Sequence, residues 1–336
     1  MTADTSPDRP LRRLAPNDLN PVEAEAVMSG AVATVTDVAA LSVSGSGTIT
    51  CLQGVLTNDI EAPGANGFVY GAVLTPKGMI VTDLWSARIA SDVHLSVPSA
   101  GRGPLVEVFQ RSLPPRLARM TDRSAELTTL RIVGPAAVER LERTDIVVPA
   151  PGRVTQSTLG SIMYTCARSP RDAPFVFQLT VPRETTEELL TLLEAGGVMA
   201  GSVATLELAR VLAGWPSLGS EIGDKTLPQE VRFDEIDGVS YSKGCFTGQE
   251  TVARVHFRGH VNRRVLGLVW DEPPDARDTT IFLGDTAVGH VTTVVWLAPL
   301  EAWIGLGLVR REVDPGTHVA ALGRSATIRD LPFDLP

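Results

Sequence analysis

The chain has 336 residues and a formal net charge of −9 at pH 7, with 43% hydrophobic and 21% charged residues, an ordinary globular balance. The acidic surplus excludes bulk binding to the phosphate backbone of nucleic acid, and no apolar run reaches the roughly 18 residues that span a membrane. Three widely separated cysteines exclude a disulfide framework and a CxxC metal or cluster site. We therefore expect a cytoplasmic protein without membrane contacts or strong direct nucleic-acid binding.

The first predicted unit spans residues 25–125 and follows a flexible tail at residues 1–24, which lacks the apolar core of a signal peptide. Its clearest element is a hairpin, because the turn signal Thr-Pro-Lys-Gly at residues 75–78 separates two strand-like runs. Those runs are residues 70–74 and 79–84. Further strands are predicted at residues 32–38, 41–44 and 93–97, and helical segments at residues 48–56 and 105–113.

The middle and C-terminal parts of the chain have different patterns. Residues 126–200 alternate strand, helix and strand over short distances, which predicts a ferredoxin-like α+β unit. Residues 201–258, which include a predicted helix at 203–213, are expected to complete the first unit. Residues 259–336 carry several short strands separated by turns, which predicts a small β-barrel. The predicted class is therefore α+β, with three domains.

The segment Lys-Gly-Cys-Phe-Thr-Gly-Gln-Glu at residues 243–250 is the most informative about chemistry. Thr247 and Glu250 stand three apart, as in a capping box, which predicts a helix capped by Thr247. Cys245 would then lie just upstream of a helix N-terminus, where the helix dipole and Lys243 stabilise a thiolate and lower its pKa. The alternative is that Cys245 is a buried packing residue in a tight turn.

This segment matches the K-G-C-[FY]-x-G-Q-E signature of YgfZ-like proteins. Three further parts of the chain resemble the same family: Leu-Gln-Gly and Leu-Thr-Asn-Asp at 52–54 and 56–59, the hairpin with Asp-Leu at 83–84, and the barrel residues 289–293 and 306–310. The resemblance covers residues 25–330. It implies a three-domain ring shared with GcvT, the T-protein of glycine cleavage, with tetrahydrofolate held in a central funnel. It also implies a role in assembling or repairing iron–sulfur proteins, including tRNA-modifying radical enzymes.

The resemblance also implies residues that bind folate. Glu230 resembles the residue that supplies the pterin-binding carboxylate in T-proteins, and Tyr70 and Asp83 are further candidates in the funnel. Arg254 belongs to a local basic cluster that could bind the glutamate tail of folate or a phosphate of a partner RNA. The plainer alternatives are a solvated loop position for Glu230, a core position for Tyr70 and a structural turn role for Asp83.

Three functions remain open at this point. The first is a tetrahydrofolate-binding protein that assists assembly or repair of iron–sulfur enzymes, with Cys245 and Lys243 as its reactive groups. The second is a folate-dependent aminomethyltransferase of the T-protein type. Leu212 argues against it, because T-proteins carry an acidic residue at that position. The third is a non-catalytic scaffold for partner proteins. No metal site is expected.

Overall fold

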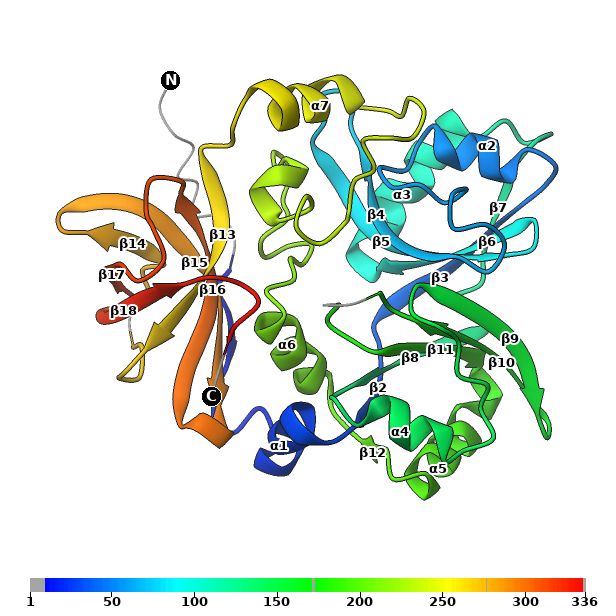
Figure 1. Cartoon of the computed structure of the whole chain (residues 1–336), viewed down its shortest axis with the longest axis horizontal. Coiled ribbons are helices and arrows are strands. Elements are labelled where there is room, and N and C mark those ends of the chain that lie inside the picture. The colour runs from blue at the N-terminus through cyan, green and yellow to red at the C-terminus, as the bar shows by residue number, and fades with distance from the viewer. Residues whose placement is uncertain (1–9, 171–172, 276, 335–336) are drawn as a thin grey trace.

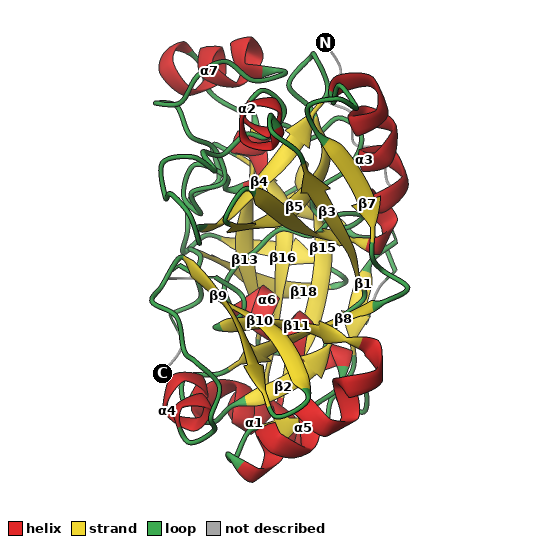
Figure 2. Cartoon of the chain, turned by 90° about the vertical axis from the view of Figure 1, so that its right-hand side faces the viewer, coloured by secondary structure: helices red, strands yellow, loops and turns green. Residues whose placement is uncertain are grey.

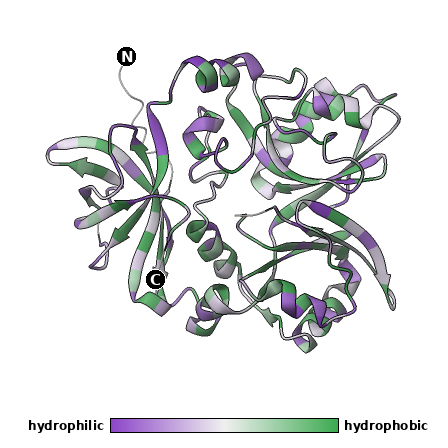
Figure 3. Cartoon of the chain, in the orientation of Figure 1, coloured by the Kyte–Doolittle hydropathy of each residue, from purple (hydrophilic) through white to green (hydrophobic). Residues whose placement is uncertain are grey.

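Three sheets account for the architecture of the chain, of which the computed structural model describes residues 10–170, 173–275 and 277–334. They surround a central region that holds helix α6 (Val203–Leu212) (Figure 1). The view turned by 90° shows the strands in the middle and most helices at the outside (Figure 2). Hydrophobic residues run along the strands of all three sheets (Figure 3). The predicted α+β class with a C-terminal barrel is confirmed.

The first sheet has five antiparallel strands in the order β4-β5-β6-β3-β7. The predicted hairpin is confirmed, because β4 (Phe68–Leu74) pairs with β5 (Ile80–Ile89) across the turn. Helix α3 packs on one face of β5 so closely that a Cβ on Gly101 would lie 2.0 Å from Oγ1 of Thr82. The remaining elements of this part are β3 (Val38–Ser44), α2 (Thr48–Gln53), β6 (Asp92–Pro98), α3 (Ser99–Ser112) and β7 (Arg119–Asp122).

The second sheet has six strands in the order β12-β2-β8-β11-β10-β9. Its strands pair antiparallel except β12, which runs parallel to β2. A separate core of Leu, Ile, Val and aromatic side chains joins this sheet to its two helices. The elements are β2 (Val32–Val35), β8 (Leu127–Val133), α4 (Ala137–Glu142), β9 (Arg153–Leu159), β10 (Ile162–Arg168), β11 (Phe177–Pro182), α5 (Thr186–Ala195) and β12 (Met199–Ala200).

The C-terminal strands close into a six-stranded barrel, because β15 pairs with both β14 and β16. Helix α7 (Gln249–Arg258) leads into it. The described residues also form three short 3-10 helices, Arg183–Thr185, Pro228–Val231 and Ala298–Leu300. The barrel strands are β13 (Arg263–Trp270), β14 (Thr280–Leu283), β15 (Thr286–Leu297), β16 (Ala302–Arg310), β17 (His318–Ala321) and β18 (Arg324–Arg329).

The structure differs from the expected segments at the N-terminal end. Residues 1–9 of the predicted tail lie outside the described residues, but residues 10–24 contain a strand and the start of a helix. Strand β1 (Arg12–Leu14) pairs in parallel with β15, and α1 (Pro21–Ser29) is capped by the side chain of Asn20. The predicted unit 25–125 also contains β2, which belongs to the second sheet because its hydrogen-bonding partners are β8 and β12. None of the helices in the described part of the chain is long and apolar enough to cross a membrane.

Candidate functional site

A cavity of about 280 Å³ lies where the first sheet, the second sheet and α6 meet. Its charged and polar lining is drawn from all three of these elements, and aromatic side chains complete the wall. Residues that the argument below uses are Asp83 and Trp85 on β5, Arg131 on β8, Phe175 just before β11, Arg210 on α6 and Trp215 just after it.

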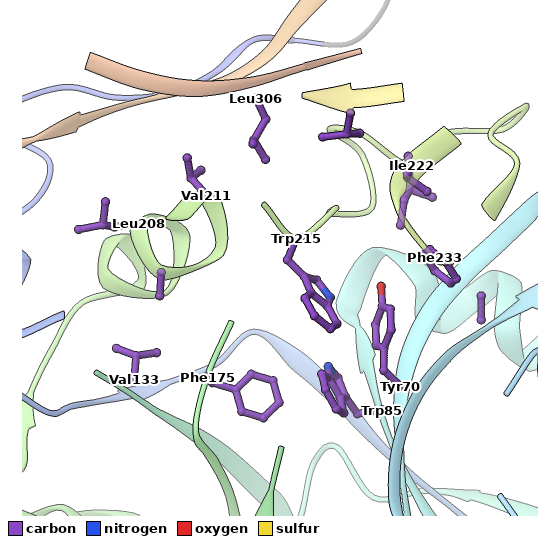
Figure 4. Close-up of a cluster of buried hydrophobic side chains, with 14 of the residues drawn as sticks. Tyr70, Trp85, Val133, Phe175, Leu208, Val211, Trp215, Ile222, Phe233 and Leu306 are labelled. Atoms are coloured by element: carbon purple, nitrogen blue, oxygen red, sulfur yellow. The ribbon is translucent and has the colours of Figure 1, made fainter. Parts of the chain in front are cut away.

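The aromatic wall is a compact group of rings (Figure 4). The indoles of Trp85 and Trp215 are stacked with 5.8 Å between ring centroids and 16° between planes. Tyr70 lies beside both, with centroid distances of 5.1 Å and 4.8 Å. Phe175 meets Trp85 edge-on at 4.9 Å. Such walls suit a flat heterocycle, because ring faces and edges attract one another at these distances.

Asp83 is a buried acid of the cavity lining, and one of its oxygens has no hydrogen-bond partner. Oδ2 accepts a hydrogen bond of 3.0 Å from the hydroxyl of Tyr70, whereas Oδ1 is buried without any hydrogen bond. Burial raises the pKa of Asp83 from 3.8 to about 6, although the Tyr70 hydrogen bond opposes the shift. Burial also raises the pKa of Tyr70, so its hydroxyl stays protonated and keeps donating. A buried acceptor without a donor costs free energy that a ligand N–H would recover.

A second charged cluster lies beside the cavity, and its central residue, Arg210, is fully hydrogen-bonded to protein groups. Arg210 donates from Nε and Nη2 to Glu207, and from Nη1 to Glu221 and to the carbonyl oxygen of Trp215. Burial would lower the pKa of Arg210, but the two carboxylates outweigh it and raise that pKa. Thr293 on β15 bonds both Arg210 and Glu221, so this cluster connects α6 to the barrel.

The signature segment lies against the first sheet's loops, away from the cavity lining. Nζ of Lys243 donates to the carbonyl oxygens of Leu56 and Asn58 at 2.8 Å and 2.9 Å, and the backbone N–H of Thr247 donates to Gly54 at 3.1 Å. Burial lowers the pKa of Lys243 to about 8. Two segments of the family resemblance, almost 190 residues apart, are therefore in direct contact.

The capping box predicted for this segment is wrong. Helix α7 begins at Gln249, so its N-cap is Gly248, which has a left-handed backbone with φ of +83°. No side chain caps the helix. The hydroxyl of Thr247 bonds to Gly54, and Glu250 pairs with Arg254 on the surface at 2.6 Å. Cys245 is exposed and lies four positions before the first helical residue, so it is not a buried packing residue.

Two comparisons by sequence place the chain among known proteins. Residues 17–236 match the GCVT N-terminal domain, and residues 263–333 match the glycine cleavage T-protein C-terminal barrel domain. The tRNA-modifying protein YgfZ of Serratia proteamaculans (strain 568) is 27% identical over 310 residues, which cover 89% of this chain and 91% of that protein. Its counterpart in Vibrio vulnificus (strain YJ016) is 25% identical over 321 residues, or 91% and 93% of the two chains.

This chain belongs to the YgfZ family of the GcvT-like superfamily. The aminomethyltransferase of Acidobacterium capsulatum is also 27% identical, over 75% of this chain and 70% of that protein. Among solved structures, aminomethyltransferase T of the glycine cleavage system from Bartonella henselae superposes with a TM-score of 0.79 at 18% identity. The match covers 96% of this chain and 91% of that one. This likeness shows a shared fold.

The structure separates the folate ligands expected for a YgfZ-family member. Asp83 lines the cavity and Tyr70 lies behind it, bonded to its carboxylate, whereas Glu230 and Arg254 are neither in the lining nor bonded to Asp83. Both carboxylate oxygens of Glu230 are engaged elsewhere: Oε1 accepts from Nε of Arg263 at 2.9 Å, and Oε2 from the backbone N–H of Leu227 at 3.0 Å. Within the described residues, no group of three or more His, Cys, Asp or Glu side chains is placed to hold a metal ion.

Sequence reasoning missed most of the cavity lining, including Trp85, Arg131 and Trp215. No motif marks the two tryptophans. Arg131, however, has a detectable signal, because it interrupts the otherwise uncharged strand β8 (Leu127–Val133). A charge inside a strand that the core should bury indicates a partner or a cavity on that face.

Proposed function

We propose that this YgfZ-family protein binds tetrahydrofolate in the central cavity and assists the assembly or repair of iron–sulfur enzymes. The second half of this proposal follows the family, whose members in Serratia proteamaculans and Vibrio vulnificus are named tRNA-modifying proteins. Clients would include tRNA-modifying enzymes that carry such clusters. The family and the absence of a membrane-spanning helix among the described residues are consistent with work in the cytoplasm.

The observation that carries the folate proposal is the unpartnered Oδ1 of Asp83 in an aromatic cavity. A pterin ring presents a ring N–H and an exocyclic amino group on one edge, and a carboxylate can accept hydrogen bonds from both. Its flat faces match the rings of Trp85 and Trp215. The volume of about 280 Å³ is at the lower end of small-molecule pockets, so it suits the ring while the remainder of folate extends outward.

The residues of this chain would hold the cofactor in defined ways. Asp83 would anchor the pterin edge, Tyr70 would keep the Asp83 carboxylate in place, and the stacked indoles would shield the ring from water. Bound tetrahydrofolate supplies a reduced nitrogen that carries one-carbon groups. The raised pKa of Asp83, about 6, leaves it mostly ionised at neutral pH and therefore able to accept the N–H groups.

Cys245 and Lys243 take different parts in this proposal. The thiol of Cys245 is exposed and lies outside the cavity lining, so it faces partner proteins rather than the folate ring. Lys243 is a positioning residue, since its ammonium holds the loop before Cys245 onto the carbonyl groups of Leu56 and Asn58. We assign Cys245 as the group that contacts the client's cluster or its precursor.

Aminomethyl transfer is a weaker match to the same geometry. Leu212, at the position where T-proteins carry an acidic residue, packs against the hydrophobic core. Three carboxylates line the described cavity. Glu207 is paired with Arg210 and Arg12, and Asp37 is exposed and accepts a hydrogen bond from Ser99. Asp83 is the buried one with an unbonded oxygen. Asp83 can hold the pterin, and the described lining offers no second buried carboxylate with an unbonded oxygen for a substrate amine.

Calorimetric titration with tetrahydrofolate tests the folate site. We expect micromolar binding by the wild type and at least tenfold weaker binding, about 1.4 kcal/mol, by Asp83→Asn. Glu230→Gln should bind like the wild type, because Glu230 is engaged with Arg263 and Leu227. If Glu230→Gln loses binding and Asp83→Asn keeps it, the pterin carboxylate is Glu230 rather than Asp83. If the wild type does not bind tetrahydrofolate, the folate proposal is refuted.

The client half of the proposal needs a separate test. In cells that lack their own YgfZ-family protein, the wild-type chain should restore the activity of an iron–sulfur tRNA-modifying enzyme, and Cys245→Ser should not. Cys51→Ser is the matched control, because Cys51 is half-buried beside the core of the first sheet. Full restoration by Cys245→Ser would favour the scaffold function.

A further inference from the structure

Two oppositely charged groups of the central cavity come from different sheets. Asp83 lies on β5 of the first sheet and Arg131 on β8 of the second, and both line the cavity. Each has an aromatic neighbour in the wall: Trp85 is also on β5, and the ring centroid of Phe175 lies 4.3 Å from the guanidinium carbon of Arg131. The cavity therefore presents a carboxylate from one sheet and a guanidinium from the other.

Arg131 has hydrogen-bond donors to spare. A guanidinium carries five N–H donors, yet its hydrogen bonds to described residues are two, from Nε and Nη2 to Oε1 of Gln178, both at 3.3 Å. These lie at the long end of the usual range. Nε2 of Gln178 donates to Ser96 at 2.7 Å, which keeps the amide oxygen turned toward Arg131. The guanidinium is thus held at one edge and on one face, while Nη1 has no partner among the described residues.

The other two arginines of the described lining differ from Arg131, because Arg210 has no donor to spare and Arg12 is exposed to solvent. Arg210 is saturated by its carboxylate, carbonyl and hydroxyl partners, and Arg12 at the surface pairs with Glu207 at 3.3 Å. Burial lowers the pKa of Arg131 to about 10, with Asp83 and Tyr70 opposing the shift, so it stays protonated at neutral pH. Arg131 is therefore the buried cation of the described cavity lining that can still donate to a ligand.

We propose that Arg131 determines ligand specificity in the central cavity by donating to a ring oxygen, while Asp83 accepts the ring's N–H groups. This inference rests on the proposed folate site and defines its ligand class: a flat heterocycle with N–H donors on one edge and a carbonyl oxygen beside them. The 2-amino-4-oxo ring of folates has this pattern. A 2,4-diamino ring would point an amino donor at a guanidinium donor, which leaves both unpaired in a site shielded from water.

Two ligands that differ at a single ring position test the inference. Tetrahydrofolate has oxygen at position 4, and tetrahydroaminopterin has an amino group there. By calorimetry, the wild type should bind tetrahydrofolate at least tenfold more tightly, a difference of about 1.4 kcal/mol. Arg131→Met keeps an apolar stem over Phe175 but removes the donors, so the preference should fall below about threefold, mainly through weaker tetrahydrofolate binding. Arg131→Lys should retain part of it.

Arg168→Met is the matched control. Arg168 lies on β10 of the same sheet, with its guanidinium carbon 5.7 Å from the ring centroid of Phe177, but it does not line the cavity. This variant should keep the wild-type preference. If Arg131→Met also keeps it, while both ligands bind, the role of Arg131 is refuted and the folate site stands. If the wild type binds neither ligand, the folate site fails and this inference fails with it.

Discussion

Gly78 and Gly248 meet backbone to backbone. A Cβ on Gly248 would lie 3.0 Å from the Cα of Gly78 and 2.6 Å from the carbonyl oxygen of Thr75. Both glycines have positive φ, +84° and +83° respectively. The hairpin turn of the first sheet and the start of α7 therefore touch where no side chain fits, and this contact joins two of the segments that carry the family resemblance.

Gly248→Ala should destabilise the protein, because alanine there combines a left-handed backbone with a contact that backbone atoms cannot relieve. We expect a loss of about 1–3 kcal/mol in the free energy of unfolding, measured by urea denaturation. Gly244→Ala in the same segment is the control, since a Cβ at Gly244 meets nothing within 4 Å. Equal losses in the two variants would contradict the importance of the close approach.

The stability of the protein should depend on pH through Asp83. Its pKa is raised from 3.8 in the unfolded chain to about 6 in the folded one, so the folded state holds this proton more tightly. The stabilisation is therefore complete below pH 4 and is lost as pH rises through 6. Relative to Asp83→Asn, the wild type should lose about 2–3 kcal/mol between pH 4 and pH 8.

Denaturation of both proteins across that pH range measures the effect. Tyr70→Phe adds a directional check, because the Tyr70 hydroxyl stabilises the ionised carboxylate. Removing it should move the midpoint of the pH dependence upward. Parallel pH curves for the wild type and Asp83→Asn would show that Asp83 titrates as it does in the unfolded chain.

Arg210→Met should be among the most damaging single substitutions. It would leave the buried carboxylates of Glu207 and Glu221 without their counter-ion, at a cost of about 3–5 kcal/mol. Arg254→Met is a matched comparison, because Arg254 also pairs with a glutamate on its own helix but at the surface, and should change stability by less than about 1 kcal/mol. Calorimetric unfolding of both variants decides whether burial makes this difference.

The three cysteines should react in a fixed order with a small alkylating reagent. Cys245 is exposed and should react first in the native protein, with half-buried Cys51 following. Cys166 is fully buried, and burial raises the pKa of its thiol to about 12, so it should react only after unfolding. Mass spectrometry of briefly treated protein reads out the order, and Cys245→Ser should remove the first adduct.

The sequence was sufficient to predict the hairpin, the barrel and the family, because turn chemistry and contiguous motifs are local properties. It was not sufficient to predict which partner each polar side chain bonds to in the folded chain. Glu230 has the right chemistry for a pterin ligand, yet Arg263, from a distant strand, takes one of its oxygens. Thr247 and Glu250 have the spacing of a capping box, yet the left-handed Gly248 starts the helix after Thr247.

The cavity could not be predicted from the sequence for a related reason. Asp83 and Tyr70 could be proposed from the hairpin, since they occupy neighbouring strands. Their apposition to Arg131 depends on how the second sheet docks on the first, which no local pattern encodes. The unusual positions of Arg131 and Arg210, charges within apolar segments, were the available signs that two elements meet there.

The parallel pairing of strand β1 determines when this strand can dock during protein synthesis. Its partner in the parallel pairing, residues 293–295 of β15, is synthesised about 280 residues later. At roughly 5–20 residues per second, a ribosome would take about 15–55 seconds to supply that partner. Residues 12–14 must therefore wait through the synthesis of two whole sheets before they can pair, and their docking is among the last events that complete the molecule.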